Sequence, residues 1–385
     1  MPVIFIVAGE PSGDAIGARF MRACRELTGG AVSFAGIGGP LMEGEGLASI
    51  FPMRDLSVMG FREVIGHIPL LLRRICETVR AIRSVRPDML LTIDSPGFCW
   101  RVAASFESDR SFPKWHYVAP TVWAYKPKRA HTLKKLYDGL LTVLPFEKPY
   151  FDAVGLPTYY VGNPVVETEE EMCGSLPSRE EFRAHFSVDA NERVVAVMPG
   201  SREGEIAAFG ADLSGAVALM AKKLPCRAFF LTLPHLRESV ERLAKKEGYA
   251  YRVVTDEREK RACRQNADVA LLKSGTSALE QTLYDSPALV CYKAHPISAF
   301  LLRRMIRTPY VSLPNIIANA PVLPELLQEH CRSDLIAECA AAFLENPEKA
   351  RIQREGMKKA LESLRVPGGD MPSVAAAKIV LGACA

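Results

Sequence analysis

The sequence has 385 residues, 48% hydrophobic and 24% charged, with a formal net charge of +4. This composition is that of an ordinary globular protein and excludes disordered, collagen-like and low-complexity chains. The length is about twice what one hydrophobic core usually organises, so two domains are expected. The 10 cysteines form no C-x-x-C pair, which disfavours a zinc ribbon or a disulfide scaffold and favours a cytoplasmic protein.

The first half of the chain predicts alternating strands and helices. Aliphatic runs at 3–8, 33–36, 89–94, 115–118 and 139–144 are separated by helical patterns. That rhythm indicates βαβ units with parallel strands and helices on both faces. The run at 3–8 has no basic stretch before it and is too short for a signal peptide. Because no run of about 18 apolar residues occurs, any membrane contact is expected to be peripheral.

The second half repeats the pattern after a break. Strand runs at 193–198, 227–233, 251–255, 269–272 and 288–292 follow an acidic stretch and a capping-box pattern, Ser178-x-x-Glu181. We therefore predict an N-terminal α/β domain at 1–165 and a C-terminal α/β domain at 166–385, whose last helices could also pack back on the first domain or on a partner. Two doubly wound domains of this kind place their strand ends on facing surfaces of a cleft, where ligands bind.

Positive charge gathers in the first half. Residues 61–135 carry fourteen Lys and Arg against six Asp and Glu. Solvated helix faces explain this as well as an anionic ligand or a membrane surface does. The apolar stretch 58–72 is followed by arginines. It predicts either a core helix with a basic outer face, or an acyl-chain groove or membrane-resting face, and 300–307 presents the same alternatives.

The first chemical motif directly follows the first strand run. Gly9 and Gly13 let the backbone approach a ligand, and Ser12 lies between them at the expected helix start. Ser12 or Asp14 could instead simply cap that helix. Glu10 stands at the carboxyl end of a parallel strand, where an acidic side chain faces the ligand crevice.

The second motif, Ile93-Asp-Ser-Pro-Gly-Phe98, delivers one carboxylate to the same sheet edge. A carboxylate shielded by apolar neighbours has a raised pKa and can accept a proton from a hydroxyl nucleophile. Asp94 is therefore the candidate general base. The alternative is an Asx-turn that closes the strand.

The third motif, Met198-Pro-Gly-Ser-Arg-Glu-Gly-Glu205, follows a strand of the second half. Backbone amides near Gly200, the hydroxyl of Ser201 and the guanidinium of Arg202 could clamp a diphosphate. An ordinary turn is the alternative.

The fourth motif, Lys273-Ser-Gly-Thr-Ser-Ala-Leu-Glu280, lies between a strand and a helix. Ser274, Gly275, Thr276 and Ser277 supply amides and hydroxyls for phosphate oxygens, and Glu280 can accept bonds from a vicinal diol such as a ribose. Together, the third and fourth motifs predict a nucleotide diphosphate site.

These motifs make the chain resemble the lipid-A-disaccharide synthase family, inverting glycosyltransferases of the GT-B fold. The resemblance runs from end to end of the chain, through Ala8-Gly-Glu-Pro-Ser-Gly-Asp14, Asp55-Leu-Ser-Val-Met-Gly60, Ile93-Asp-Ser-Pro96, Tyr117-Val-Ala-Pro-Thr-Val-Trp-Ala124, Leu144-Pro-Phe-Glu-Lys148, Pro199-Gly-Ser-Arg202, Ser274-Gly-Thr-Ser-Ala-Leu-Glu280 and Tyr310-Val-Ser-Leu-Pro-Asn315.

The resemblance implies transfer of 2,3-diacylglucosamine from UDP-2,3-diacylglucosamine to the 6-hydroxyl of 2,3-diacylglucosamine 1-phosphate, which gives a β-1,6-linked disaccharide 1-phosphate and UDP in lipid A biosynthesis. It implies no cofactor and no metal, and the seven histidines show no metal-ligand spacing. Members of the family are peripheral on the cytoplasmic face of the inner membrane, and some form homodimers by exchanging C-terminal segments. No nucleic-acid partner is expected.

Residue roles carry over by resemblance only. Asp94 matches the carboxylate that activates the acceptor hydroxyl, and Glu10 an acid near the sugar. Arg202 and Asn315 match the UDP-sugar site, as do the 274–277 loop and Glu280. The acyl-contacting surface corresponds to Met59 and Phe61, and Asn163 stands where the family often has histidine.

Two alternatives to this function remain open from the sequence. One is another GT-B enzyme that acts on UDP-N-acetylglucosamine, such as a murein-type transferase or a 2-epimerase. The other is a UDP-sugar-binding protein without catalysis, which would need no general base at Asp94.

Overall fold

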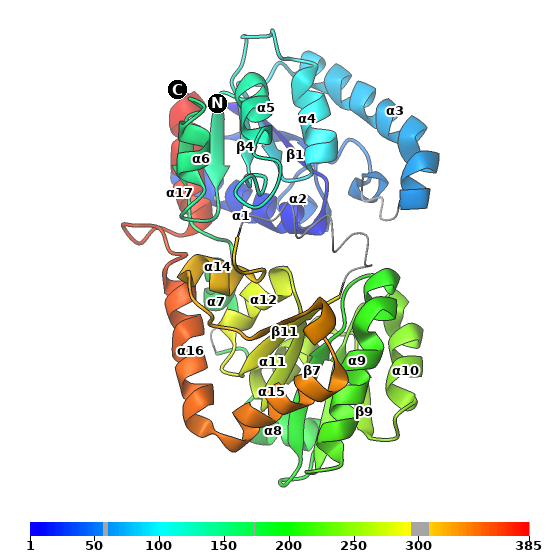
Figure 1. The fold of residues 1–385 in the computed structure, drawn as a ribbon. Helices are drawn as coiled ribbons and strands as arrows, with labels where there is room; N and C mark the ends of the chain where they lie inside the picture. The colour runs from blue at the N-terminus through cyan, green and yellow to red at the C-terminus, as the bar shows by residue number, and fades with distance from the viewer. Residues whose placement is uncertain (57–60, 173, 294–307, 385) are drawn as a thin grey trace. The chain divides into compact units, whose positions relative to one another are not determined.

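The computed structural model describes residues 1–56, 61–172, 174–293 and 308–384, without the side chains of 61–67 (Figure 1). The chain forms two compact units. The first unit comprises Met1–Glu167 and Leu364–Ala385, and the second unit comprises Thr168–Ser363. The segment from 364 onward, which the sequence analysis assigned with 166–385, thus belongs to the first unit.

The first unit is built around a six-stranded parallel sheet in the order β2-β1-β3-β4-β5-β6. The strands are β1 Val3–Ala8, β2 Ser33–Ile37, β3 Met89–Ile93, β4 Lys114–Tyr117, β5 Gly139–Thr142 and β6 Thr158–Tyr160. The helices are α1 Pro11–Thr28, α2 Pro40–Gly44, α3 Phe61–Val85, α4 Pro96–Ala104, α5 Arg129–Leu136, α6 Lys148–Asp152, the unit-crossing α7 Val165–Met172 and α17 Pro372–Cys384.

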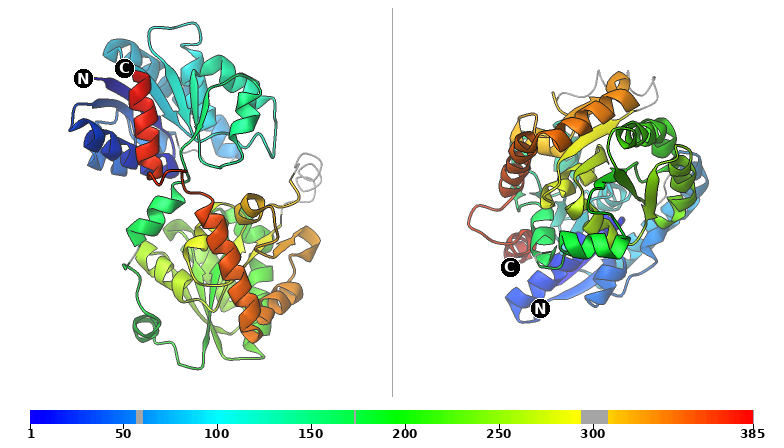
Figure 2. Two further views of the ribbon diagram at one scale, coloured as in Figure 1. Left: turned by 90° about the vertical axis from the view of Figure 1, so that its left-hand side faces the viewer. Right: turned by 90° about the horizontal axis from the view of Figure 1, so that it is seen from below.

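Strand β1 shows why this sheet needs helices on both faces. Its side chains alternate between two hydrophobic clusters because successive residues of a strand point to opposite faces. Ile4, Ile6 and Ala8 pack with residues of α1 and α17. Phe5 and Val7 pack with residues of α3 and α4 on the other face. Helix α17 lies against α1, as Figure 1 and the left view of Figure 2 show, where the red helix packs on blue segments.

The second unit repeats this plan with a parallel sheet in the order β12-β11-β10-β7-β8-β9. The strands are β7 Arg193–Met198, β8 Cys226–Leu231, β9 Ala250–Val254, β10 Val269–Lys273, β11 Ala288–Tyr292 and β12 Glu325–Leu327. The helices are α8 Arg179–Phe186, α9 Glu203–Ala221, α10 Arg237–Lys245, α11 Glu257–Asn266, α12 Thr276–Glu280, α14 Leu313–Ala318, α15 Ser333–Glu345 and α16 Pro347–Glu362.

Two layers of helices also cover this second sheet. Val195 and Val197 of β7 pack with residues of α9, α10 and α15, whereas Val194, Ala196 and Met198 face α8, α11 and α16. The predicted α/β fold with two doubly wound parallel sheets is confirmed. The short edge strands β6 and β12 are not among the predicted runs. In β6, Thr158 is buried, Tyr159 is exposed and Tyr160 is half-buried, and the three residues of β12 are half-buried.

Helix α9 is the one helix in the described ranges that is long and apolar enough to cross a membrane by length and composition. Phe209, Leu213 and Val217 of this helix are buried in the core of the second unit. That burial is typical of the core helix of a globular domain.

Candidate functional site

The order of the first sheet reverses between β1 and β3, and two of the predicted carboxylates follow these two strands. Ala8 pairs with Ile93 in the parallel register, so the chain leaves both strands at the same edge. Glu10 comes two residues after Ala8, and Asp94 directly follows Ile93. In doubly wound sheets, ligands bind in the crevice at such a reversal, outside the carboxyl ends of the strands.

Asp94 occupies a strained, half-buried turn. Its φ is +49° and that of Ser95 is +44°, both in the left-handed region that residues other than glycine seldom adopt. The backbone N–H of Asp94 donates to the Tyr117 carbonyl at 2.9 Å, which fixes the turn against β4. Burial raises the pKa of the Asp94 carboxyl above its ordinary value, while a hydrogen bond from the Ser95 backbone opposes the shift. These properties suit a general base.

Close packing against Ser95 explains the glycine at position 9. A Cβ on Gly9 would lie 2.6 Å from the Ser95 hydroxyl oxygen and 3.0 Å from the Ser95 Cβ, so a larger residue there would displace Ser95 in the loop after β3. A Cβ on Gly13 would lie 3.5 Å from the Ile93 carbonyl oxygen, in ordinary contact. Both loops of the candidate site are thus packed directly against each other.

Glu10 is exposed at this edge. The buried thiol of Cys99 lies near enough to both carboxylates for their charges to affect its pKa. The Cys99 Sγ is 3.9 Å from the Val7 carbonyl oxygen and 4.0 Å from that of Ile93. Burial raises the pKa of this thiol, and the negative charges of Asp94 and Glu10 raise it further. The fold therefore brings the two predicted catalytic residues to one edge.

The helix-capping alternative for the first motif is wrong. The N-cap residue of α1 is Glu10, and no side chain caps the helix there. Ser12 is exposed on its first turn, whereas Asp14 is buried and accepts backbone N–H bonds from Gly39, Leu41 and Met42 at 2.9 to 3.0 Å. Asp14 thus satisfies the amides at the start of α2, a role that depends on a contact about 25 residues away in the sequence.

A carboxylate that the sequence analysis did not single out lies beneath the same edge. Glu147 is 1% exposed and follows β5. It accepts hydrogen bonds from the Trp123 indole N–H at 3.2 Å and the Leu144 backbone N–H at 3.1 Å. Burial raises the pKa of Glu147 to about 7, although these bonds act in the opposite direction. The bond to Trp123 ties down the loop that follows β4.

We expect Glu147 to make the stability of the first unit depend on pH. Its pKa is about 7 in the fold against an ordinary 4.5, so the folded state retains the proton longer than the unfolded chain. The free energy of unfolding should therefore fall as pH rises from 4.5 to 7, by about 3 kcal/mol in total. In Glu147→Gln this contribution disappears.

Urea unfolding at several pH values measures this effect. All 3 tryptophans lie in the first unit, at positions 100, 115 and 123, so their fluorescence reports its unfolding. The difference between wild type and Glu147→Gln isolates the titration of this one group. Exposed Glu107→Gln serves as the control. Parallel pH profiles for wild type and Glu147→Gln would contradict the assignment.

The second sheet reverses between β7 and β10, and the third and fourth motifs follow these strands. Met198 pairs with Leu272 in the register. Gly200 has a φ of +122°, and a Cβ there would lie 2.6 Å from an oxygen of Glu205, so the turn requires glycine. Ser201 is exposed, and Arg202 is the N-cap residue of α9 with a side chain 65% exposed. The guanidinium is thus available at this edge.

Glu205 holds the two loops of this edge together. One of its carboxylate oxygens accepts the Ser201 backbone N–H at 3.0 Å, and the other pairs with Lys273 Nζ at 2.8 Å. Arg202 lies 4.0 Å from the same carboxylate. Glu205 ends the third motif and Lys273 begins the fourth, and neither residue was a predicted site residue. The sequence places Glu203 and Glu205 in the first turn of α9, which indicates a polar helix start. It does not indicate that Glu205 pairs with Lys273.

The loop after β10, which the fourth motif predicts to bind phosphate, is only partly accessible. Ser274 is buried, whereas Gly275 and Thr276 are exposed and Ser277 is half-buried at the start of α12. Glu280 is 51% exposed, and one of its oxygens accepts from Arg264 at 2.9 Å. Arg264 also bonds to the carbonyl of Ser277. This buried arginine therefore fixes Glu280 relative to the loop.

Asn315 and Asn163 have structural roles. Asn315 is 1% exposed, and hydrogen bonds of 2.7 to 2.8 Å join its side chain to the backbone of Leu323 and the carboxylate of Glu325. Asn163 is buried and bonds to the Val143 carbonyl at 3.1 Å and the Val165 N–H at 3.0 Å. Direct ligand contact by Asn315, expected above, is not supported by this burial, because its amide is already occupied within the protein.

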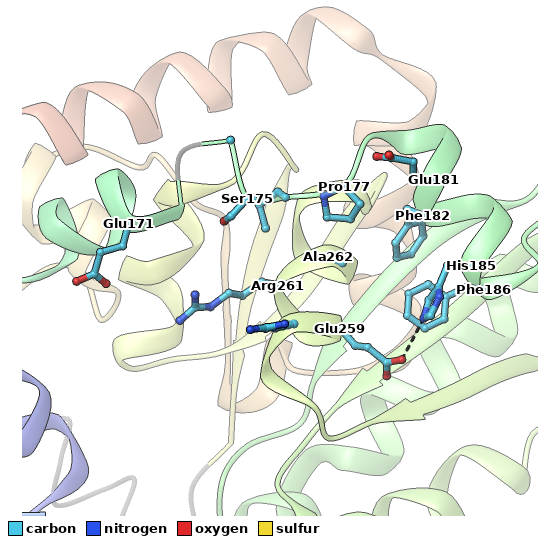
Figure 3. A pocket seen from close by; sticks show the side chains of 13 residues that line it. Glu171, Ser175, Pro177, Glu181, Phe182, His185, Phe186, Glu259, Arg261 and Ala262 are labelled. Atoms are coloured by element: carbon cyan, nitrogen blue, oxygen red, sulfur yellow. Dashed lines mark hydrogen bonds and ion pairs between the residues drawn. The ribbon is translucent and has the colours of Figure 1, made fainter. Parts of the chain in front are cut away.

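The structure does not describe the side chains predicted to contact acyl chains. Met59, the side chain of Phe61 and the segment 300–307 lie outside the described residues. A cavity of about 900 Å³ lies between α8, α11 and the loop before α8, where His185 bonds to Glu259 at 3.1 Å (Figure 3). None of the predicted site residues lines this cavity.

The chain is similar to one protein family over nearly its whole length. Residues 4–379 match the family model described as lipid-A-disaccharide synthetase. A protein of Rhodospirillum centenum named lipid-A-disaccharide synthase is 39% identical, over 98% of this chain and 94% of the relative. The protein of that name from Paramagnetospirillum magneticum is 40% identical, over 98% and 97% of the two chains.

Solved structures resemble the fold at low sequence identity. The S. aureus MnaA–UDP co-structure matches with a TM-score of 0.68 at 13% identity, covering 99% of this chain and 95% of that one. The UDP-GlcNAc 2-epimerase from Methanocaldococcus jannaschii, in complex with UDP-GlcNAc and UDP, has a TM-score of 0.62 at 12% identity and 99% coverage of both chains. These similarities support the fold alone.

Proposed function

Because the chain belongs to the lipid-A-disaccharide synthase family and is a glycosyltransferase of lipid A biosynthesis, we propose that it joins UDP-2,3-diacylglucosamine to 2,3-diacylglucosamine 1-phosphate. The products are the β-1,6-linked disaccharide 1-phosphate and UDP. The observation that carries the proposal is the half-buried carboxylate of Asp94, with its raised pKa, at the reversal of the first sheet.

In this proposal the first unit prepares the nucleophile. Asp94 takes the proton of the acceptor 6-hydroxyl while the oxygen attacks the anomeric carbon of the donor, on the face opposite UDP. Glu10, exposed at the same edge, bonds to sugar hydroxyls and orients the acceptor. The packed loops at Gly9 and Ser95 keep both carboxylates in place, and a fixed geometry lowers the entropic part of the barrier.

The second unit holds the donor in the same proposal. The exposed fork of Arg202 and the amides near Gly200 and Gly275 bind the diphosphate. Glu280, fixed by Arg264, accepts bonds from the ribose hydroxyls. When the bond between the anomeric carbon and the phosphate oxygen breaks, negative charge grows on UDP, and Arg202 stabilises it. A UDP-sugar donor is consistent with two solved structures of similar fold, which are described as complexes with UDP or UDP-GlcNAc.

We further propose that the protein works peripherally at the cytoplasmic face of the inner membrane, because both substrates carry acyl chains. For a C-terminally exchanged homodimer, the relevant contact is that of α17 with α1. An exchange would re-form this contact between two chains without any new surface.

The test is UDP release from UDP-2,3-diacylglucosamine in detergent, with and without the phosphorylated acceptor and with EDTA. We expect acceptor-dependent release that resists EDTA. Release only from unacylated UDP-N-acetylglucosamine would contradict the proposed substrates and favour another UDP-sugar enzyme. UDP-sugar binding with no turnover of either donor would indicate a binding protein.

A further inference from the structure

Four cations lie along the two segments that follow β3 and β4, the strands on which the Asp94 turn is fixed. They are Arg101, Lys126, Lys128 and Arg129, called the cation cluster below. Arg101 belongs to α4, and its guanidinium folds back to donate to the carbonyl of Gly97, three residues after Asp94. Lys126, Lys128 and Arg129 belong to the end of the loop after β4 and the start of α5. Helices α4 and α5 contact each other.

Aromatic rings order part of this cluster. The Arg129 guanidinium lies over the ring of Trp100 at 5.7 Å and over that of Tyr125 at 5.9 Å. The ammonium of Lys126 lies 4.8 Å from the centroid of the same Tyr125 ring. Sharing one ring brings these two cations together, and each cation–π contact restricts a side chain that would otherwise be mobile.

The loop backbone that carries these cations is also fixed. Val118 at its start has a φ of +76°, an uncommon conformation for a β-branched residue. Trp123 is buried and bonded to Glu147. The Tyr125 N–H donates to the Thr121 carbonyl at 2.9 Å. Strain held in place by surrounding packing is found at ligand sites more than elsewhere.

The charge of the cluster meets no compensating carboxylate among the described residues. Some other cations of the first unit pair with carboxylates, for example Arg74 with Asp55 at 2.5 Å and Arg110 with Asp138 at 3.4 Å. Within the described part of the chain, no carboxylate lies within ion-pair distance of any cluster member. An ordered, uncompensated group of ammonium and guanidinium ions attracts anions, and arginine in particular suits phosphate.

Resting on the proposed function, we propose that the cation cluster binds the 1-phosphate of the acceptor. The acceptor must present its 6-hydroxyl to Asp94, and its phosphate lies on the anomeric carbon of the same sugar ring. The phosphate is therefore held within one sugar ring of Asp94. Arg101 folds back onto Gly97, close after Asp94 in the chain. The other three cations follow β4, the strand that holds the Asp94 turn. The cluster thereby selects a phosphorylated acceptor and sets which hydroxyl reaches the base.

The test compares phosphorylated and dephosphorylated acceptors in detergent, with the full chain and the acylated UDP-sugar donor. Arg129→Gln and Lys126→Gln each remove a charge and retain a polar side chain. We expect KM for the phosphorylated acceptor to rise roughly 10- to 100-fold, with KM for the donor unchanged. The preference of wild type for the phosphorylated acceptor should shrink by the same factor. Lys134→Gln, an exposed cation on α5 outside the cluster, should behave as wild type.

The outcomes separate the two proposals. Absence of wild-type turnover contradicts the proposed function itself. Wild-type turnover with no preference for phosphate, or unchanged acceptor KM in both variants, overturns the phosphate site. Normal kinetics in detergent combined with weaker binding to phosphatidylglycerol vesicles also overturns it, and assigns the cluster to a bilayer surface. Thermal unfolding checks each variant, and exposed Lys126 provides the variant least able to affect folding.

Discussion

Replacing Asp94 by asparagine is expected to lower kcat for acceptor-dependent UDP release by about 10²- to 10⁴-fold, the usual contribution of a general base. The amide keeps the shape of the side chain but cannot take the hydroxyl proton, so KM for either substrate should change little. The measurement is steady-state kinetics with the phosphorylated acceptor in detergent. Asp152→Asn, which changes an exposed carboxylate paired with Lys148 at 2.5 Å, is the matched control.

The pH profile of kcat distinguishes a base from a structural carboxylate. Burial raises the pKa of Asp94, and the base acts only when ionised. Activity should therefore fall as pH decreases, with a midpoint above the ordinary carboxyl value of 3.8. In Asp94→Asn, the residual kcat should no longer fall in this acidic pH range. A variant with wild-type kcat, or with the same acidic limb, would contradict the role of Asp94.

Replacing Arg202 by alanine is expected to lower kcat by about 10²- to 10³-fold, as removal of a donor that stabilises developing charge does in other enzymes. The side chain is 65% exposed and packs little, so the fold should be unaffected. Arg202→Lys keeps the charge without the planar fork and should recover part of the loss.

Isotope-labelled donor in single-turnover experiments measures the chemical step in these variants directly. Arg351→Ala on α16, an arginine 52% exposed and paired only with carboxylates of its own helix in the described residues, is the control. If Arg202→Ala raises KM for the donor but leaves the single-turnover rate intact, the guanidinium binds the ground state and does not stabilise the leaving group.

The parallel sheets explain why much of the candidate site could be predicted from sequence. Apolar runs identify central strands, and parallel strands all end at one edge. The residues after such runs are Asp94 and Glu10 in one unit and Arg202 and Ser274 in the other. They can therefore be placed at the carboxyl edge of their sheet without knowledge of long-range contacts. The role of each remains a proposal, since proximity to an edge does not itself define chemistry.

Residues whose roles depend on distant partners could not be predicted in this way. Asp14 stands in a glycine-rich motif, but its partners are the amides at the start of α2. Asn315 carries a conspicuous polar group that is satisfied by Glu325 and Leu323. Glu205 and Lys273 are far apart in sequence and pair across the sheet reversal. A local sequence pattern places a polar residue on a strand, helix or loop. Its hydrogen-bond and ion-pair partners depend on the tertiary packing.

The placement of α17 on α1 has a consequence for biosynthesis. Residues 168–363 form the second unit and separate the two parts of the first unit. At ribosomal rates of about 5–20 residues per second, synthesis of this insert takes roughly 10–40 s. Throughout that time the surface of α1 that receives Ala376, Ala377 and Val380 has no cover from its own chain. The first unit can therefore complete its α1–α17 contact only after the whole second unit has been synthesised.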